Sequence, residues 1–218
     1  LLSELPKIHP DNPVRLLHLL LLRSISLAAP MLVSANGSLE VEELKKISLV
    51  ATKEQKAAVI TKLEHIREAI PNSGTAMFLS GYWHQLVTEK MPEAVKWYQQ
   101  AVSEQKNGSA QYALAWCKLN GKGLRQDREK AVELYQKGAN DGHAAAEYSY
   151  AECLFAGLGV TENKEEAIKW FKWSATLGDP DASFKLGMCY KKGQGVSKDK
   201  EEANKWFKKA ASQGNAEA

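Results

Sequence analysis

Hydrophobic and small residues recur along the chain at a spacing of 36 positions. In each copy an alanine is followed four residues later by an aromatic ring, which puts both side chains on one face of a helix. The pairs are Ala131 and Tyr135, Ala167 and Phe171, and Ala203 and Phe207, with Ala94 and Tyr98 as a weaker first copy. A fixed period of this length predicts an all-α fold, an α-solenoid of stacked antiparallel helix pairs.

The two helices of each pair are expected to approach each other closely. A small residue lies in the middle of every first helix: Gly81, Ala115, Ala151 and Gly187. The second helix supplies the alanine and the ring, so a small surface faces a large one and the two interlock. Second helices are predicted to begin near Asp127, Asn163 and Asp199 and to end at Gly142, Gly178 and Gly214. Glu166 and Glu202 follow two of these caps at the spacing of a capping box.

A Gly-x-Gly sequence joins the two helices of the later repeats, as in Gly157-Leu158-Gly159. Glycine-rich loops can bind phosphate, but that chemistry needs a strand before the loop. A helix precedes the loop here, so we predict that the glycines adopt positive φ in a tight turn. The first repeat lacks both glycines, and 13 residues separate Gly81 from Ala94 where 16 separate Ala115 from Ala131.

The N-terminal third is organised differently. Residues 1–35 form an apolar helical segment: Asn12-Pro13 is typical of a helix start, and residues 16–22 are apolar on nearly every side. Arg23 interrupts this run before it reaches the roughly 20 residues of a membrane span. We favour a helix buried against a neighbour or a partner, with a secretory signal ending at residues 33–35 or a membrane-surface helix as alternatives. Residues 36–71 predict a helical hairpin that caps the repeat array of residues 72–218.

Composition narrows the function classes. The net charge of +3 is too mild for a nucleic-acid-binding protein, which usually carries a concentrated basic patch. The three cysteines are 36 residues apart and predict free, buried side chains, which favours a reducing compartment, with export as the alternative. Neither the cysteines nor the five histidines have the spacing of a metal site, and no cofactor motif is present. No residues have the arrangement of a nucleophile and its base, so an enzyme is not predicted.

The last repeat carries a specific motif. From Ala182 to Gly214 the sequence follows Ala-x-x-x-Leu-Gly, then Gly-x-Gly-Val, then Asp-x-x-x-Ala-x-x-Trp-Phe-x-x-Ala-Ala-x-x-Gly. This resembles the Sel-one-like repeat (SLR) family, relatives of the tetratricopeptide repeats, over about residues 72–218. The resemblance implies a right-handed superhelix and an adaptor role in assembling protein complexes. The first repeat departs from the motif at its loop.

The inner surface of such a solenoid offers a candidate binding site. The residues one and four positions after the small mid-helix residue should border the concave groove formed by the first helices. They vary between repeats while the packing positions do not, as expected for a site on a regular scaffold. We predict partner contacts from Tyr82, Trp116, Leu119, Glu152, Phe155, Met188 and Lys191. The alternative is that these rings are buried against neighbouring repeats.

The sequence therefore predicts a protein–protein interaction scaffold or adaptor that holds a partner protein or peptide in its concave groove. The alternative is an assembly subunit or a membrane-peripheral tether, in which residues 1–35 form an oligomer or contact a membrane. The chain begins without Met and stops where a fifth first helix should start, so we expect it to be a fragment or to be followed by further repeats.

Overall fold

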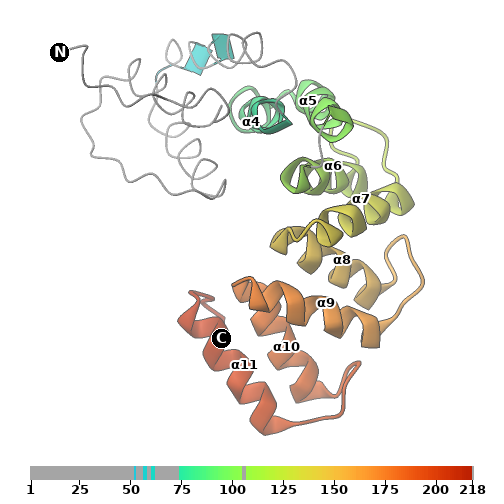
Figure 1. Cartoon of the computed structure of the whole chain (residues 1–218), viewed down its shortest axis with the longest axis vertical. Coiled ribbons are helices and arrows are strands. Elements are labelled where there is room, and N and C mark those ends of the chain that lie inside the picture. Colours follow the sequence, from blue (N-terminus) through green and yellow to red (C-terminus); the bar gives the residue numbers. More distant parts are fainter. Residues whose placement is uncertain (1–51, 53–55, 58–59, 62–73, 105–106, 218) are drawn as a thin grey trace, which may run out of the picture. The chain divides into compact units, whose positions relative to one another are not determined.

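The computed structural model describes residues 52, 56–57, 60–61, 74–104 and 107–217 (Figure 1). Within these residues the structure is helical and contains no strand. The elements are α4 (Gly74–Trp83), the π-helix η1 (His84–Thr88), α5 (Met91–Glu104), α6 (Gly108–Asn120), α7 (Arg128–Asn140), α8 (Ala144–Ala156), α9 (Lys164–Thr176), α10 (Pro180–Lys192) and α11 (Lys200–Ser212). The predicted all-α repeat fold is confirmed.

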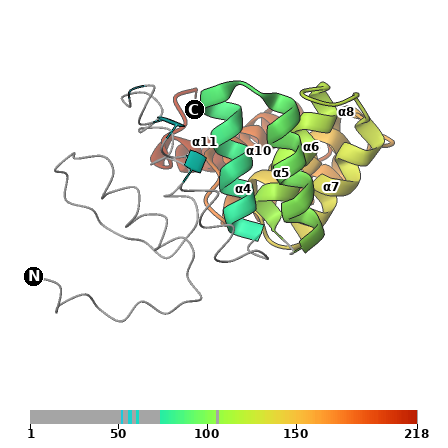
Figure 2. The ribbon, with the colours of Figure 1, turned by 90° about the horizontal axis from the view of Figure 1, so that it is seen from above.

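The chain divides into two compact units at the junction of Lys106 and Asn107. In the described part of the first unit, α4 packs side by side with α5 (Figure 2). In the second unit, each first helix packs against its own second helix, α6 with α7, α8 with α9 and α10 with α11. The pairs stack because α7 also packs on α8, and α9 on α10. The second unit is therefore an α-solenoid of antiparallel helix pairs.

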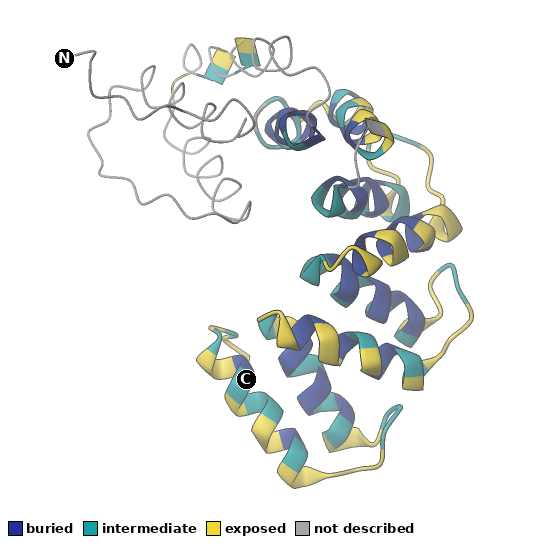
Figure 3. Cartoon of the chain, viewed as in Figure 1, coloured by how far each residue is buried: buried dark blue, intermediate teal, exposed yellow. Residues whose placement is uncertain are grey.

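The predicted interlocking of small residues and rings is present inside the helix pairs. A Cβ atom added to Gly187 would lie 2.6 Å from Phe207, and one added to Gly81 would lie 2.6 Å from Tyr98. These distances are shorter than any van der Waals contact, so the glycines allow the rings to lie against the helix backbone. Figure 3 shows the result in the second unit, where the buried faces of the helices meet.

The loop glycines adopt the predicted positive φ, and two of them, Gly159 and Gly195, have a second role. Gly157 has φ 66° and ends α8, where its N–H donates to the carbonyl of Cys153. Gly159 has φ 72°, and a Cβ atom there would lie 2.5 Å from the carbonyl oxygen of Arg128. Gly195 meets Lys164 in the same way at 2.6 Å. Each of these two loops therefore rests on the first turn of the preceding second helix, a contact that sequence reasoning did not predict.

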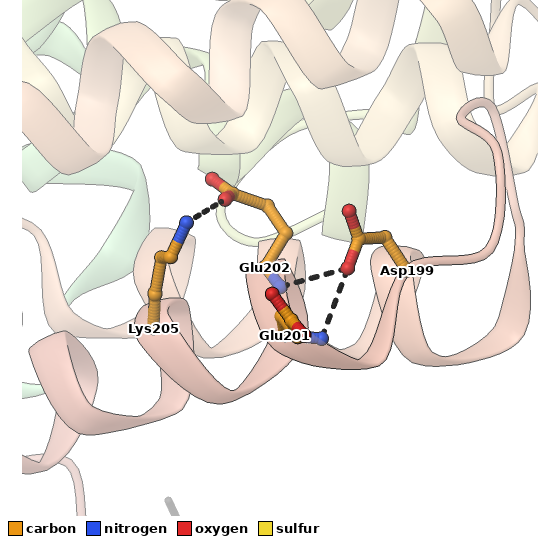
Figure 4. A network of polar contacts seen from close by, with 4 residues as sticks. All are labelled: Asp199, Glu201, Glu202 and Lys205. Atoms are coloured by element: carbon orange, nitrogen blue, oxygen red, sulfur yellow. Dashed lines mark hydrogen bonds and ion pairs between the residues drawn. The ribbon is translucent and has the colours of Figure 1, made fainter.

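The second helices begin at the predicted caps, but the capping boxes close on one side only. The Asp199 carboxylate accepts hydrogen bonds from the N–H groups of Glu201 and Glu202, at 2.9 and 3.0 Å (Figure 4). The Glu202 carboxylate pairs with Lys205 at 3.1 Å instead of returning to the cap. The N–H of Asp199 is already used, because it donates to the carbonyl of Tyr190 at 3.0 Å. The cap of α9 has the same arrangement.

The first repeat replaces the glycine loop with a π-helix. Thr88 closes η1 by donating its hydroxyl to the carbonyl of His84 at 2.9 Å. Glu89 then takes the left-handed conformation, φ 53°, that a glycine has in the other repeats. The shorter connection was predicted from the sequence, but the π-helix was not.

Most of residues 1–73 lie outside the described residues, and with them the apolar segment 1–35 and most of the hairpin 36–71. Those two assignments stay predictions. In the described portion of the chain, no helix is both long enough and apolar enough to cross a lipid bilayer.

Candidate functional site

The seven predicted contact residues all lie on first helices. Lys191 is exposed and the other six are half-buried. Tyr82 belongs to α4 in the first unit, where its ring stacks on Phe78 with the centroids 6.0 Å apart. The remaining six belong to α6, α8 and α10 of the second unit: Trp116, Leu119, Glu152, Phe155, Met188 and Lys191.

Two of the predicted residues meet a lysine that sequence reasoning missed. Lys185 of α10 forms an ion pair with Glu152 at 2.8 Å, and its ammonium lies 4.9 Å from the centroid of the Phe155 ring. The ammonium of Lys164, at the start of α9, lies 5.6 Å from the centroid of the same Phe155 ring. Phe155 also faces Phe171, with the centroids 6.2 Å apart. Phe155 thus contributes to packing inside its own repeat as well as to the surface.

Trp116 and Leu119 lie almost one turn apart on α6, and both are half-buried. The backbone carbonyl of Trp116 accepts a hydrogen bond of 2.9 Å from the side-chain amide of Asn120, the last residue of α6. An apolar pair at this spacing forms one continuous surface on a helix. The patch that would join this pair to Phe155 stays a prediction.

The three cysteines are free and buried, as predicted. Burial raises the pKa of Cys117, Cys153 and Cys189 to about 11, so the thiols are protonated near neutral pH and behave as small apolar side chains. In the described ranges no group of His, Cys, Asp or Glu could hold a metal ion. The buried side chains of the three cysteines contribute to packing.

A pocket that sequence reasoning did not predict lies on the second helices. Its volume is about 370 Å³, and none of the seven predicted residues lines it. The lining comes from the end of α7, the first turn of α8 and the outer side of α9: Ala139, Asn140, Gly142, Glu147, Trp170, Trp173, Thr176 and Leu177. We call it the third-repeat pocket. Trp170 packs edge-on against Trp173, with the centroids 4.9 Å apart.

The 36-residue spacing contains a signal for this pocket. Two of its residues are large and apolar where the neighbouring repeats are polar, and each is 55% exposed. Trp173 corresponds to Lys137 and Lys209, and Leu177 corresponds to Asp141 and Gln213. These two differences from the neighbouring repeats are visible in the sequence and mark the pocket.

The Sel1 repeat pattern matches the chain at residues 74–105, 108–143, 144–179 and 180–215. The chain belongs to the Sel1 repeat family. Its four Sel1 repeats coincide with the helix pairs described above. Members of this family generally act as non-enzymatic scaffolds for protein–protein interaction.

Solved structures of Sel1 repeat proteins are similar to this chain. A Sel1 repeat protein from Oxalobacter formigenes is 27% identical with a TM-score of 0.66, over 80% of this chain and 74% of that one. The protein c5321, a protective antigen of uropathogenic Escherichia coli strains with an SLR fold, is 20% identical with a TM-score of 0.64. That match covers 95% of this chain and 46% of c5321, and it shows the fold alone. A search of curated proteins finds no significant match.

Proposed function

We propose that this Sel1 repeat protein is an adaptor that holds a partner peptide or helix in the groove lined by its first helices. The supporting observation is a row of half-buried side chains, among them Trp116, Leu119 and Phe155, on an otherwise regular helix array. Trp and Tyr are frequent anchors of interfaces, and a rigid array reduces the entropy that a partner loses on binding. Glu152 and Lys185 form the polar border of this row.

The test is photo-crosslinking from position 119. A photoreactive amino acid replaces Leu119, and crosslinked partners are captured from a lysate of the source organism and identified by mass spectrometry. We expect a defined set of partners that is lost when Trp116→Ala is added, while the melting temperature changes by no more than a few degrees. The same photoreactive residue at Lys169, an exposed position of α9, is the control. Equal capture from position 169, or capture that survives Trp116→Ala, would contradict the groove.

Melting of the variants separates a binding surface from a core. Phe155 contacts Phe171, so the double variant Trp116→Ala, Phe155→Ala is compared with each single variant. A large cooperative loss of stability from Trp116→Ala alone would show that this ring is core, and the groove proposal would then fail.

The apolar segment 1–35 supports a second candidate function, assembly or membrane contact, because residues 16–22 are apolar on nearly every side. Light scattering of the full chain and of a variant without residues 1–35 tests assembly. Co-sedimentation of both with lipid vesicles tests membrane contact. If the full chain and the shortened variant are both monomeric and neither binds vesicles, this function is dismissed.

A further inference from the structure

The fourth repeat covers its own outward surface. The Ser183 hydroxyl, at the start of α10, donates a hydrogen bond to the side-chain carbonyl of Gln213 at 2.8 Å. The ammonium of Lys209 lies 5.1 Å from the ring of Trp206. The buried hydroxyl of Ser183 and the half-buried ring of Trp206 are therefore each met by a side chain of the same repeat, the hydroxyl by an amide and the ring by a cation.

The third repeat has the same positions and lacks both partners. Glu147 stands where the fourth repeat has Ser183, and Leu177, which cannot form a hydrogen bond, stands where it has Gln213. Glu147 is 6% exposed, and among the described residues its Oε2 atom has no hydrogen-bond partner. A buried carboxylate oxygen without a partner is costly, because it has lost its water without gaining a donor.

Electrostatics agree with this geometry. Burial, followed by the nearby carboxylate of Asp179, raises the pKa of Glu147. Such an environment disfavours the negative charge, and an arriving cation would relieve it. Trp173 takes the place of Lys209, so the ring of Trp170 meets a second ring instead of an ammonium.

We propose that the third-repeat pocket binds an arginine side chain of a partner protein, with its guanidinium directed to Glu147 and in contact with the indole rings of Trp170 and Trp173. The guanidinium supplies both missing groups at once, the donor that Glu147 lacks and the cation that Lys209 provides in the fourth repeat. Arginine fits better than lysine because its planar group stacks on aromatic faces and is less strongly hydrated.

The size and rim of the pocket fit a single side chain of a larger partner. A volume of about 370 Å³ is near the lower end for binding pockets and suits one long side chain. Leu177 and Trp173 are each 55% exposed at its border, where an apolar residue beside the arginine would cover them. The polar residues at the same places in adjacent repeats show that the fold does not need these apolar groups.

A peptide titration followed by NMR tests the proposal on the full chain. The probes are three blocked tripeptides with leucine at both ends. The central residue is arginine, its neutral isostere citrulline, or glutamate. We expect saturable shifts of the Trp170 and Trp173 indole N–H signals with the arginine peptide, and a dissociation constant about tenfold weaker with citrulline. The glutamate peptide should cause no shift. Equal affinities for arginine and citrulline, or no saturable shift, would overturn the proposal.

The neighbouring repeats supply matched variants. Glu147→Gln introduces the residue found at Gln111 and should remove the preference for arginine over citrulline. Leu177→Gln and Trp173→Lys introduce the residues of the fourth repeat and should each weaken arginine binding about tenfold. Binding that is unchanged in Trp173→Lys would refute the site.

Two controls identify other occupants and separate this site from the groove. Trp116→Ala should leave the arginine titration unchanged, so either proposal can fail without the other. Gel filtration across protein concentrations tests self-association. A dimer that Trp173→Lys dissociates would show that a second copy of this chain occupies the surface, which would overturn the arginine proposal.

Discussion

The third and fourth repeats, residues 144–179 and 180–215, are built on one pattern and differ in what they expose. Inside the helix pairs they carry the same or similar residues, as with Phe171 and Phe207 or with Ala151 and Gly187. On the outside, Trp173 and Leu177 replace Lys209 and Gln213. The inner positions are restricted by close packing, whereas the outer ones are free to change, so the outer differences are the ones that point to a partner.

The two repeats also differ in how far they are covered. Phe171 is 0% exposed because α10 packs over α9, whereas Phe207 on α11 is half-buried. Figure 3 shows the same contrast between the helices, with more exposed residues along α11. Equivalent residues thus contribute unequally to the stability of this 218-residue chain.

The largest expected effect is the loss of a covered ring. Phe171→Ala should lower the free energy of unfolding by about 3–5 kcal/mol, because it removes buried area and leaves a cavity. Phe207→Ala should cost clearly less, since its ring is already half in water. Denaturant unfolding followed by circular dichroism measures both values. Equal losses would mean that burial does not distinguish these two repeats.

The loop glycines should behave alike in both repeats. Gly159→Ala and Gly195→Ala should each cost about 2–4 kcal/mol, because the new Cβ atom meets the backbone of the preceding second helix and φ is positive. Gly178→Ala is the control, since it has positive φ but no atom within 4 Å, and should cost only about 1 kcal/mol. Similar losses at Gly159 and Gly178 would contradict a role for the loop contact.

The caps of the first helices predict opposite responses to acid. Nδ1 of His143 accepts the N–H of Ala146, and burial lowers the pKa of this histidine. The contribution of His143 to the free energy of unfolding is complete above its pKa in the unfolded chain, about 6.5. It is lost as the pH falls from there through the lower pKa of the folded state. Asp179 caps α10, and burial raises its pKa. The contribution of Asp179 to the free energy of unfolding is complete below its pKa in the unfolded chain, about 3.9. It is lost as the pH rises through the higher pKa of the folded state.

Melting temperatures at neutral and mildly acidic pH test this contrast. His143→Asn keeps a cap residue that does not titrate, so the variant should lose less stability than the unmodified chain on acidification. Asp179→Asn removes the contribution that grows in acid and should therefore lose more. The prediction is wrong if both variants follow the unmodified chain.

The smallest effect on stability is expected at the outward positions. Trp173→Lys with Leu177→Gln gives the third repeat the outer residues of the fourth and should change the free energy of unfolding by no more than about 1 kcal/mol. The contact between Trp170 and Trp173 is lost, but less apolar surface remains in water. Thermal unfolding of the double variant measures this, and a loss as large as that of Phe171→Ala would mean that Trp173 belongs to the core.

Some features of the site were within reach of sequence reasoning and others were not. The row on the first helices follows from helix register, and its members are on first helices as predicted. Lys185, which pairs with Glu152, lies 33 residues further along the chain and became a neighbour only through stacking. The third-repeat pocket could have been suspected from Trp173 and Leu177. Glu147, in contrast, stands in a helix without any local sign that its carboxylate is buried and unpaired.

The sequence by itself determined the helix pairs, the caps of the second helices and the order of the pairs, because the 36-residue period, the small residues and the glycines act over a few turns of chain. Only the tertiary structure decided that Gly159 rests on Arg128 and that Gly195 rests on Lys164. These contacts join residues about 30 positions apart, and their distances depend on how one repeat is set against the next. Local propensity carries no information about that arrangement, whereas packing does.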